Sequence, residues 1–134
     1  MITSDNKNGV KISTAIVVDD DYDVVDAFSE YLEIKGIRVL GKGYNGKEAV
    51  DLYKKLKPDV MTLDIIMPEV EGVDALKAIR EITTEDPQAR ILMVSAMGQQ
   101  ETVVEAIQAG AKDFIVKPFQ PSNVTSAVKR LLKR

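Results

Sequence analysis

Short apolar runs alternate along the chain with longer stretches in which apolar residues recur at helical spacing. The short runs are rich in β-branched residues and nearly continuous in apolar character, which is typical of strands covered on both faces of a parallel sheet. We therefore predict five strands. They lie at Thr14–Val18, Ile37–Gly41, Val60–Leu63, Ile91–Val94 and Phe114–Val116.

The longer stretches predict five helices, because their apolar residues repeat at intervals of three and four. The first runs from Asp21 to Lys35, and Gly36 is suited to ending it. Asn45 and Glu48 form a capping-box pattern that opens the second. The other three helices are marked by the sets Val73, Leu76, Ile79, Ile82; Val103, Val104, Ile107; and Val124, Ala127, Val128, Leu131, Leu132.

This order of elements is (βα)5, and right-handed crossovers turn it into a three-layer α/β sandwich around a five-stranded parallel sheet. The 134 residues, 45% of them hydrophobic, suffice for one buried core. Residues 1–12 are polar, and we expect a mobile tail there. Residues 13–134 then form a single domain, and nothing in the pattern requires an oligomer, so we expect a monomer.

Composition excludes several kinds of chemistry. The chain has no Cys and no His, so a thiolate nucleophile, an imidazole base and the usual soft-metal ligands are absent. The net charge is −3 and no large basic block is present, which argues against nucleic-acid binding. No apolar run approaches the length of a membrane span, and no secretory signal is visible. We therefore expect a cytoplasmic protein that does not bind membranes.

Polar residues stand where the predicted strands end. Asp19 and Asp20 follow the first strand, Asp64 the third, Ser95 the fourth and Lys117 the fifth. Sites in open parallel sheets form at the carboxyl ends of the strands. Each residue has a simpler reading by itself: a helix cap, a turn residue, a turn hydroxyl or a surface lysine. These separate explanations do not account for the convergence of all these residues on one edge of the sheet.

Together these residues favour one chemistry. Carboxylates from two strand ends form an oxygen-rich pocket suited to a hard cation such as Mg²⁺. One carboxylate can then attack phosphorus and form an aspartyl phosphate. Lys117 supplies a cation for the phosphoryl oxygens, and Ser95 supplies a short hydroxyl donor.

The sequence resembles the receiver domain of response regulators over residues 13–133, and within that family the single-domain chemotaxis (CheY-like) branch. The resemblance implies the strand order 2-1-3-4-5. The motifs that carry it are "VVDDD" at 17–21, "LDIIMPEVEG" at 63–72, "MVSAMG" at 93–98 and "DFIVKPF" at 113–119.

The resemblance also implies roles for individual residues. Asp64 is the phosphoacceptor, and Asp20 binds Mg²⁺ directly. Asp19 acts on the metal largely through water, and the backbone carbonyl of Ile66 completes the protein ligands. Lys117 pairs with the phosphoryl group.

A second group of implied roles concerns switching. Pro118 follows a cis peptide bond that aims the preceding lysine. Ser95 moves toward the phosphoryl group, and Phe114 rotates inward as it does so. Some relatives carry tyrosine at the position of Phe114, so a contact made through that hydroxyl is not expected here.

The implied function is that of a stand-alone response regulator of a two-component phosphorelay. It takes a phosphoryl group from a histidine kinase or histidine phosphotransfer protein, with only weak catalysis of its own phosphorylation and dephosphorylation. It then binds a downstream protein, in chemotaxis or motility signalling. The expected docking surface is the helix 4–strand 5–helix 5 face. The residues named on it are Gln99, Val104, Phe114 and Gln120.

Two alternatives stay open from the sequence. One is a receiver that serves another pathway, as a phosphorelay intermediate or a phosphate sink. The other is an aspartate-nucleophile phosphatase on an α/β fold. Such phosphatases commonly carry a second acid two residues after the nucleophile, and Ile66 at that position argues against one.

Overall fold

A computed structural model of the chain describes residues 11–133. The predicted tail over residues 1–12 therefore lies outside the described residues, apart from Lys11 and Ile12. The strands are β1 (Thr14–Val18), β2 (Arg38–Gly43), β3 (Val60–Asp64), β4 (Ile91–Ala96) and β5 (Asp113–Lys117). The helices are α1 (Tyr22–Ile34), α2 (Gly46–Leu56), α3 (Ala75–Glu85), α4 (Gln100–Ala109) and α5 (Pro121–Leu132).

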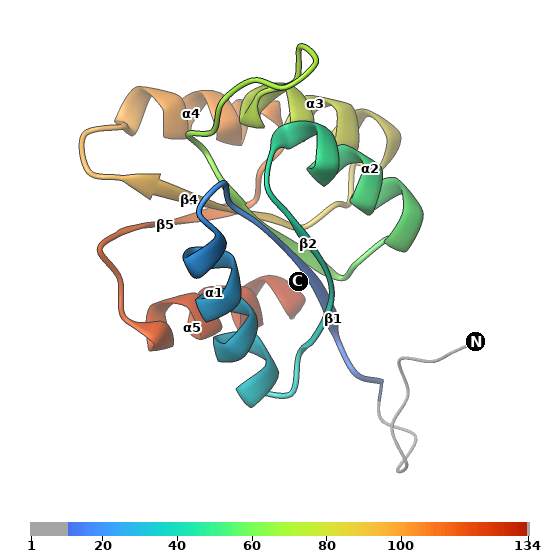
Figure 1. Cartoon of the computed structure of the whole chain (residues 1–134), viewed down its shortest axis with the longest axis vertical. Helices are drawn as coiled ribbons and strands as arrows, with labels where there is room; N and C mark the ends of the chain where they lie inside the picture. Colours follow the sequence, from blue (N-terminus) through green and yellow to red (C-terminus); the bar gives the residue numbers. More distant parts are fainter. Residues whose placement is uncertain (1–10, 134) are drawn as a thin grey trace.

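Within residues 11–133 the five strands form one parallel sheet of order β2-β1-β3-β4-β5. Helices α1 and α5 cover one face of the sheet, and α2, α3 and α4 cover the other (Figure 1). The predicted (βα)5 three-layer sandwich and its strand order are confirmed. No helix of the described residues has both the length and the apolar character needed to cross a membrane.

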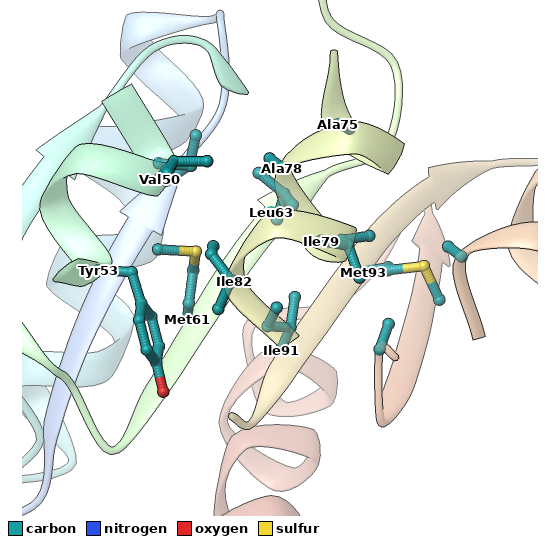
Figure 2. Close-up of a cluster of buried hydrophobic side chains, with 14 of the residues drawn as sticks. Val50, Tyr53, Met61, Leu63, Ala75, Ala78, Ile79, Ile82, Ile91 and Met93 are labelled. Carbon is teal, nitrogen blue, oxygen red and sulfur yellow. The ribbon is translucent and has the colours of Figure 1, made fainter. Parts of the chain in front are cut away.

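Each face of the sheet has its own hydrophobic core. On the face covered by α2 and α3, Ile79 and Ile82 of α3 lie over Met61 of β3 and Ile91 of β4 (Figure 2). The opposite core contains Phe28 of α1, whose ring meets Phe119 edge-on with 5.1 Å between the ring centroids. Because β1, β3 and β4 are buried on both faces, they are held in place from two sides.

The edge strands differ from the prediction. We expected nearly continuous apolar runs, yet β2 and β5 alternate between more and less exposed residues. Both strands lie at the edges of the sheet, where the packing helices leave some of their side chains exposed. The second strand also begins one residue later than predicted, at Arg38, and ends two residues later, at Gly43. Polar Lys42 belongs to the strand because the pairing with β1 continues through it.

Side chains cap the first three helices. Asp21 accepts a hydrogen bond from the Asp23 amide at the start of α1. At α2, Asn45 accepts from the Glu48 amide at 2.8 Å, and the Glu48 carboxylate accepts from the Tyr44 amide instead of the Asn45 amide.

The start of α3 corrects the sequence prediction. Val73 was assigned to this helix by its spacing, but the helix begins at Ala75 with Asp74 as its cap. Val73 instead pairs with Val70 in the preceding loop and is buried there. Val73 therefore has the burial and the spacing of a helix residue although it precedes the start of α3.

Gly46 is the position where α2 approaches the loop before α3 most closely. A Cβ atom there would lie 2.7 Å from the backbone oxygen of Asp74, which cannot move as a side chain would. We expect Gly46→Ala to lower the free energy of unfolding by about 1–3 kcal/mol in urea denaturation. Gly41→Ala is the control, because its Cβ would meet only methyl ends of Leu56 and Leu52 at 3.2–3.3 Å. Equal losses in the two variants would contradict this explanation.

Candidate functional site

Three carboxylates converge at the carboxyl edge of the sheet. Asp19 and Asp20 follow β1, and Asp64 ends β3, the strand beside it. One oxygen from each lies within 4.8 Å of the others. Asp19 and Asp64 are buried, whereas Asp20 is exposed. The cluster is therefore acidic inside and open to solvent on one side.

Asp19 is the most constrained of the three. The residue is 3% exposed, and its Oδ1 accepts a hydrogen bond from the Asp21 amide at 2.9 Å. Its own amide donates to the Gly43 carbonyl of β2 at 3.1 Å. Burial raises the pKa of Asp19 from 3.8 to about 6, and the charge of Asp64 adds to this rise. The Asp21 amide and Lys117 oppose it without cancelling it.

Lys117 brings a positive charge to this pair of acids. Its Nζ lies 3.5 Å from Oδ2 of Asp19 and 3.4 Å from Oδ2 of Asp64. Burial by itself lowers the pKa of Lys117, but the two carboxylates outweigh burial and the pKa is raised. The ammonium group therefore stays charged. The peptide bond from Lys117 to Pro118 is cis.

The carboxylate of Asp64 is oriented by the loop that follows it. Its Oδ1 accepts a hydrogen bond from the Ile66 amide at 3.1 Å, while Oδ2 faces Lys117. The Ile66 side chain is exposed, so this residue meets the site through its backbone.

The predicted switch residues lie to one side of the acids. Ser95 is 1% exposed, and its hydroxyl lies 3.5 Å from the Ile115 carbonyl, to which it donates. Phe114 is 42% exposed on the adjoining strand. A largely apolar groove of about 540 Å³ runs between β5, the end of β4 and α4, and both residues line it. The serine in this structure thus faces β5 and not the carboxylates.

Two backbone contacts of the site were not predicted from the sequence. The Gly43 carbonyl and the Asp21 amide both hold Asp19. Asp21 could have been found, since an acid two residues before an amide often accepts its hydrogen bond. Gly43 could not, because its contact depends on the register between β1 and β2, which a single sequence does not specify.

The donor set fits a hard divalent cation. Carboxylate oxygens are the ligands that Mg²⁺ prefers, and an exposed acid such as Asp20 leaves room for the waters that Mg²⁺ retains. Burial raises the pKa of Asp19 despite the nearby ammonium group of Lys117, and a bound cation would favour the charged carboxylate. Asp19, Asp20 and Asp64 are therefore suited to hold Mg²⁺.

Comparison with known proteins identifies this arrangement. Residues 15–129 match the response regulator receiver domain family. The chain belongs to that family. It is a receiver domain of the phosphorelay type, in which a carboxylate accepts a phosphoryl group, and this assignment displaces the alternative of an aspartate-nucleophile phosphatase.

Two of the relatives that this receiver domain resembles are chemotaxis proteins named CheY. It is 51% identical to the chemotaxis protein CheY of Thermotoga maritima, covering 88% of this chain and 96% of the relative. It is 49% identical to CheY of Bacillus subtilis, covering 87% and 95% of the two chains. Among solved structures, the receiver domain of NtrX from Brucella abortus superposes with a TM-score of 0.82 at 30% identity, covering 89% and 98%.

Asp19 makes stability depend on pH in a defined direction. Because folding raises its pKa to about 6, the folded state holds the proton more tightly than the unfolded state, and stability falls as pH rises from about 4 to 6. In Mg²⁺-free buffer, Asp19→Asn removes this cost. We expect a gain of about 1–3 kcal/mol at pH 7 that fades toward pH 4.

Urea denaturation across this pH range measures the effect. Asp21→Asn is the matched control, since it keeps a good cap at an exposed position and should show no pH-dependent gain. A gain at Asp19→Asn that persists undiminished at pH 4 would contradict the burial argument.

Proposed function

We propose that this receiver domain accepts a phosphoryl group on Asp64 from a histidine kinase or histidine phosphotransfer protein, with Mg²⁺ as cofactor. The observation that carries the proposal is the convergence of Asp19, Asp20 and Asp64 beside Lys117. Phosphoryl transfer depends on positioning and on neutralising charge, and this edge of the sheet offers both.

Each of these groups has its own role in the proposed phosphoryl transfer. An oxygen of the Asp64 carboxylate forms a bond to phosphorus, the P–N bond of the donor breaks, and its electron pair returns to the histidine nitrogen. Lys117 offsets the negative charge of the phosphoryl oxygens. Mg²⁺ bound by Asp19, Asp20, Asp64 and the Ile66 carbonyl supplies further charge neutralisation. Self-catalysed loss of the group is slow in this proposal, so the domain works as a switch and not as an enzyme that turns over.

The proposed switch passes through the end of β4. Ser95 gives up its hydrogen bond to Ile115 and turns toward the phosphoryl group, and Phe114 rotates into the adjoining groove. A groove lined by apolar side chains beside a partly exposed ring supports this proposal. The readout surface is then the α4–β5–α5 face. The residues assigned to it are Gln99, Val104, Phe114 and Gln120.

Identity near one half to two CheY proteins, with almost complete coverage of both, favours chemotaxis or motility signalling. We propose that residues 13–134 act as a monomeric, stand-alone receiver in the cytoplasm, without binding nucleic acid or membrane. The partner is a downstream protein of the motility apparatus. A receiver that relays the phosphoryl group to another protein, or stores it, is the competing assignment.

The acids after β1 should contribute unequally to phosphorylation. Asp20→Ala removes the exposed Mg²⁺ ligand and should abolish Mg²⁺-dependent labelling of Asp64 by phosphoramidate. Asp19→Ala should weaken labelling by at least about tenfold, since an outer ligand tunes the site. Asp21→Ala should leave it nearly intact, because that side chain caps α1. Mass spectrometry of the intact protein measures the labelled fraction, and equal losses in the three variants would contradict this division.

The pathway is tested with the Mg²⁺–beryllofluoride form of the protein as bait, since this complex mimics an aspartyl phosphate. Recovery of a flagellar motor or adaptor protein, lost with Phe114→Ala, is the expected result. Recovery of a histidine phosphotransfer protein instead would support the relay. Asp64→Asn bait, which cannot form the complex, is the control.

A further inference from the structure

Two tyrosine rings are stacked at the same edge of the sheet as the acids. The ring centroids of Tyr22 and Tyr44 lie 4.1 Å apart, and the ring planes meet at 18°. Tyr44 is partly buried and packs against the core on the α1–α5 face. Tyr22 is 65% exposed. One ring is therefore anchored, and the other lies on it with much of its outer face free.

The stack is attached to the segments that build the acidic site. Tyr22 is the first residue of α1 and comes two residues after Asp20. Tyr44 directly follows Gly43, whose carbonyl accepts the hydrogen bond from the Asp19 amide. The rings thus join the loop after β1 to the loop after β2, at the rim of the carboxylate cluster.

Acidic residues flank Tyr22 in the sequence. Asp20, Asp21 and Asp23 are all exposed next to Tyr22 in the sequence. A flat aromatic ring beside several carboxylates attracts a planar, positively charged group, both by stacking and through the electrons of its face. The ring of a phosphoimidazole is planar and is cationic when its other nitrogen is protonated, while its negative charge lies on the phosphoryl group.

We propose that the Tyr22–Tyr44 stack receives the imidazole ring of the phosphodonor, so that Tyr22 is a specificity-determining residue for phosphoryl transfer to Asp64. This inference rests on the proposed function and adds to it a site for the leaving group. In the transfer, the Asp64 oxygen bonds to phosphorus and the P–N bond breaks. Its electron pair stays on the ring nitrogen, and the protonated donor leaves as neutral imidazole.

Two small donors isolate the contribution of the ring. Phosphoimidazole carries the ring and phosphoramidate does not, and both transfer through a P–N bond. The second-order rate constant for labelling of Asp64 is measured with each donor at saturating Mg²⁺. We expect Tyr22→Leu to lower the rate constant for phosphoimidazole by about three- to tenfold, which is the range of one aromatic pair. The rate constant for phosphoramidate should change by less than about twofold.

The ratio of the two rate constants separates recognition from structure. A purely structural role in holding the two loops together would lower both rate constants alike and leave the ratio unchanged. Tyr22→Phe keeps the ring and should keep the wild-type ratio. Tyr31→Leu is the matched control on the same helix, since that ring contacts Phe28 in place of Tyr44.

Each outcome decides something. If Tyr22→Leu leaves the ratio of the two rate constants unchanged while Asp64 is still labelled, the proposed role of the Tyr22–Tyr44 stack is wrong. The phosphoacceptor proposal is then unaffected. If neither donor labels the wild-type protein, or if Asp64→Asn is labelled as much as the wild type, the phosphoacceptor proposal is wrong. The proposed role of the Tyr22–Tyr44 stack is then wrong as well. A selective loss with phosphoimidazole that Tyr22→Phe restores supports both.

Discussion

The burial of two carboxylates, Asp19 and Asp64, at one edge of the sheet is the constraint on which the site of this receiver domain depends. Asp19 follows β1 and Asp64 ends the neighbouring strand β3, so the parallel sheet itself brings them together. Lys117 joins them from the edge strand β5. It pairs in register with Ala96 of β4, and its ammonium group extends past that strand to both acids. The strand order thus fixes which charges meet, and one lysine leaves them incompletely neutralised.

This electrostatic arrangement accounts for the fit to a divalent ion and a phosphoryl group. A buried acid with a raised pKa favours either a proton or a cation. Asp20 is exposed beside Asp19, so an ion can reach the cluster from solvent while Asp19 and Asp64 stay buried. The carboxylates that would hold a cation and the ammonium group that would face a phosphoryl group therefore lie at one edge of the sheet. Among the described residues, no second domain contributes to them.

The sequence predicted most of this because strand ends are easy to recognise. Asp19, Asp64, Ser95 and Lys117 each follow an apolar run in the sequence, and parallel strands end at a common edge. The sequence did not reveal side-chain direction. Ser95 stands at the predicted strand end, yet its hydroxyl faces Ile115, because β4 pairs with β5 there. The burial of the edge strands was also predicted less well, because side chains of β2 and β5 are more exposed than those of the central strands.

The position of Ser95 connects the acidic site to the groove beneath α4. Its hydroxyl is held by β5, and its neighbour across that pairing is Val116, two residues beyond Phe114. Any movement of Ser95 toward the acids removes a hydrogen bond from a buried group, and a buried group must find another partner. A phosphoryl oxygen at Asp64 can replace the Ile115 carbonyl as that partner, whereas the carboxylate by itself already faces Lys117 and the Ile66 amide. The proposed switch uses this replacement to couple the charge state of Asp64 to the position of the Phe114 ring.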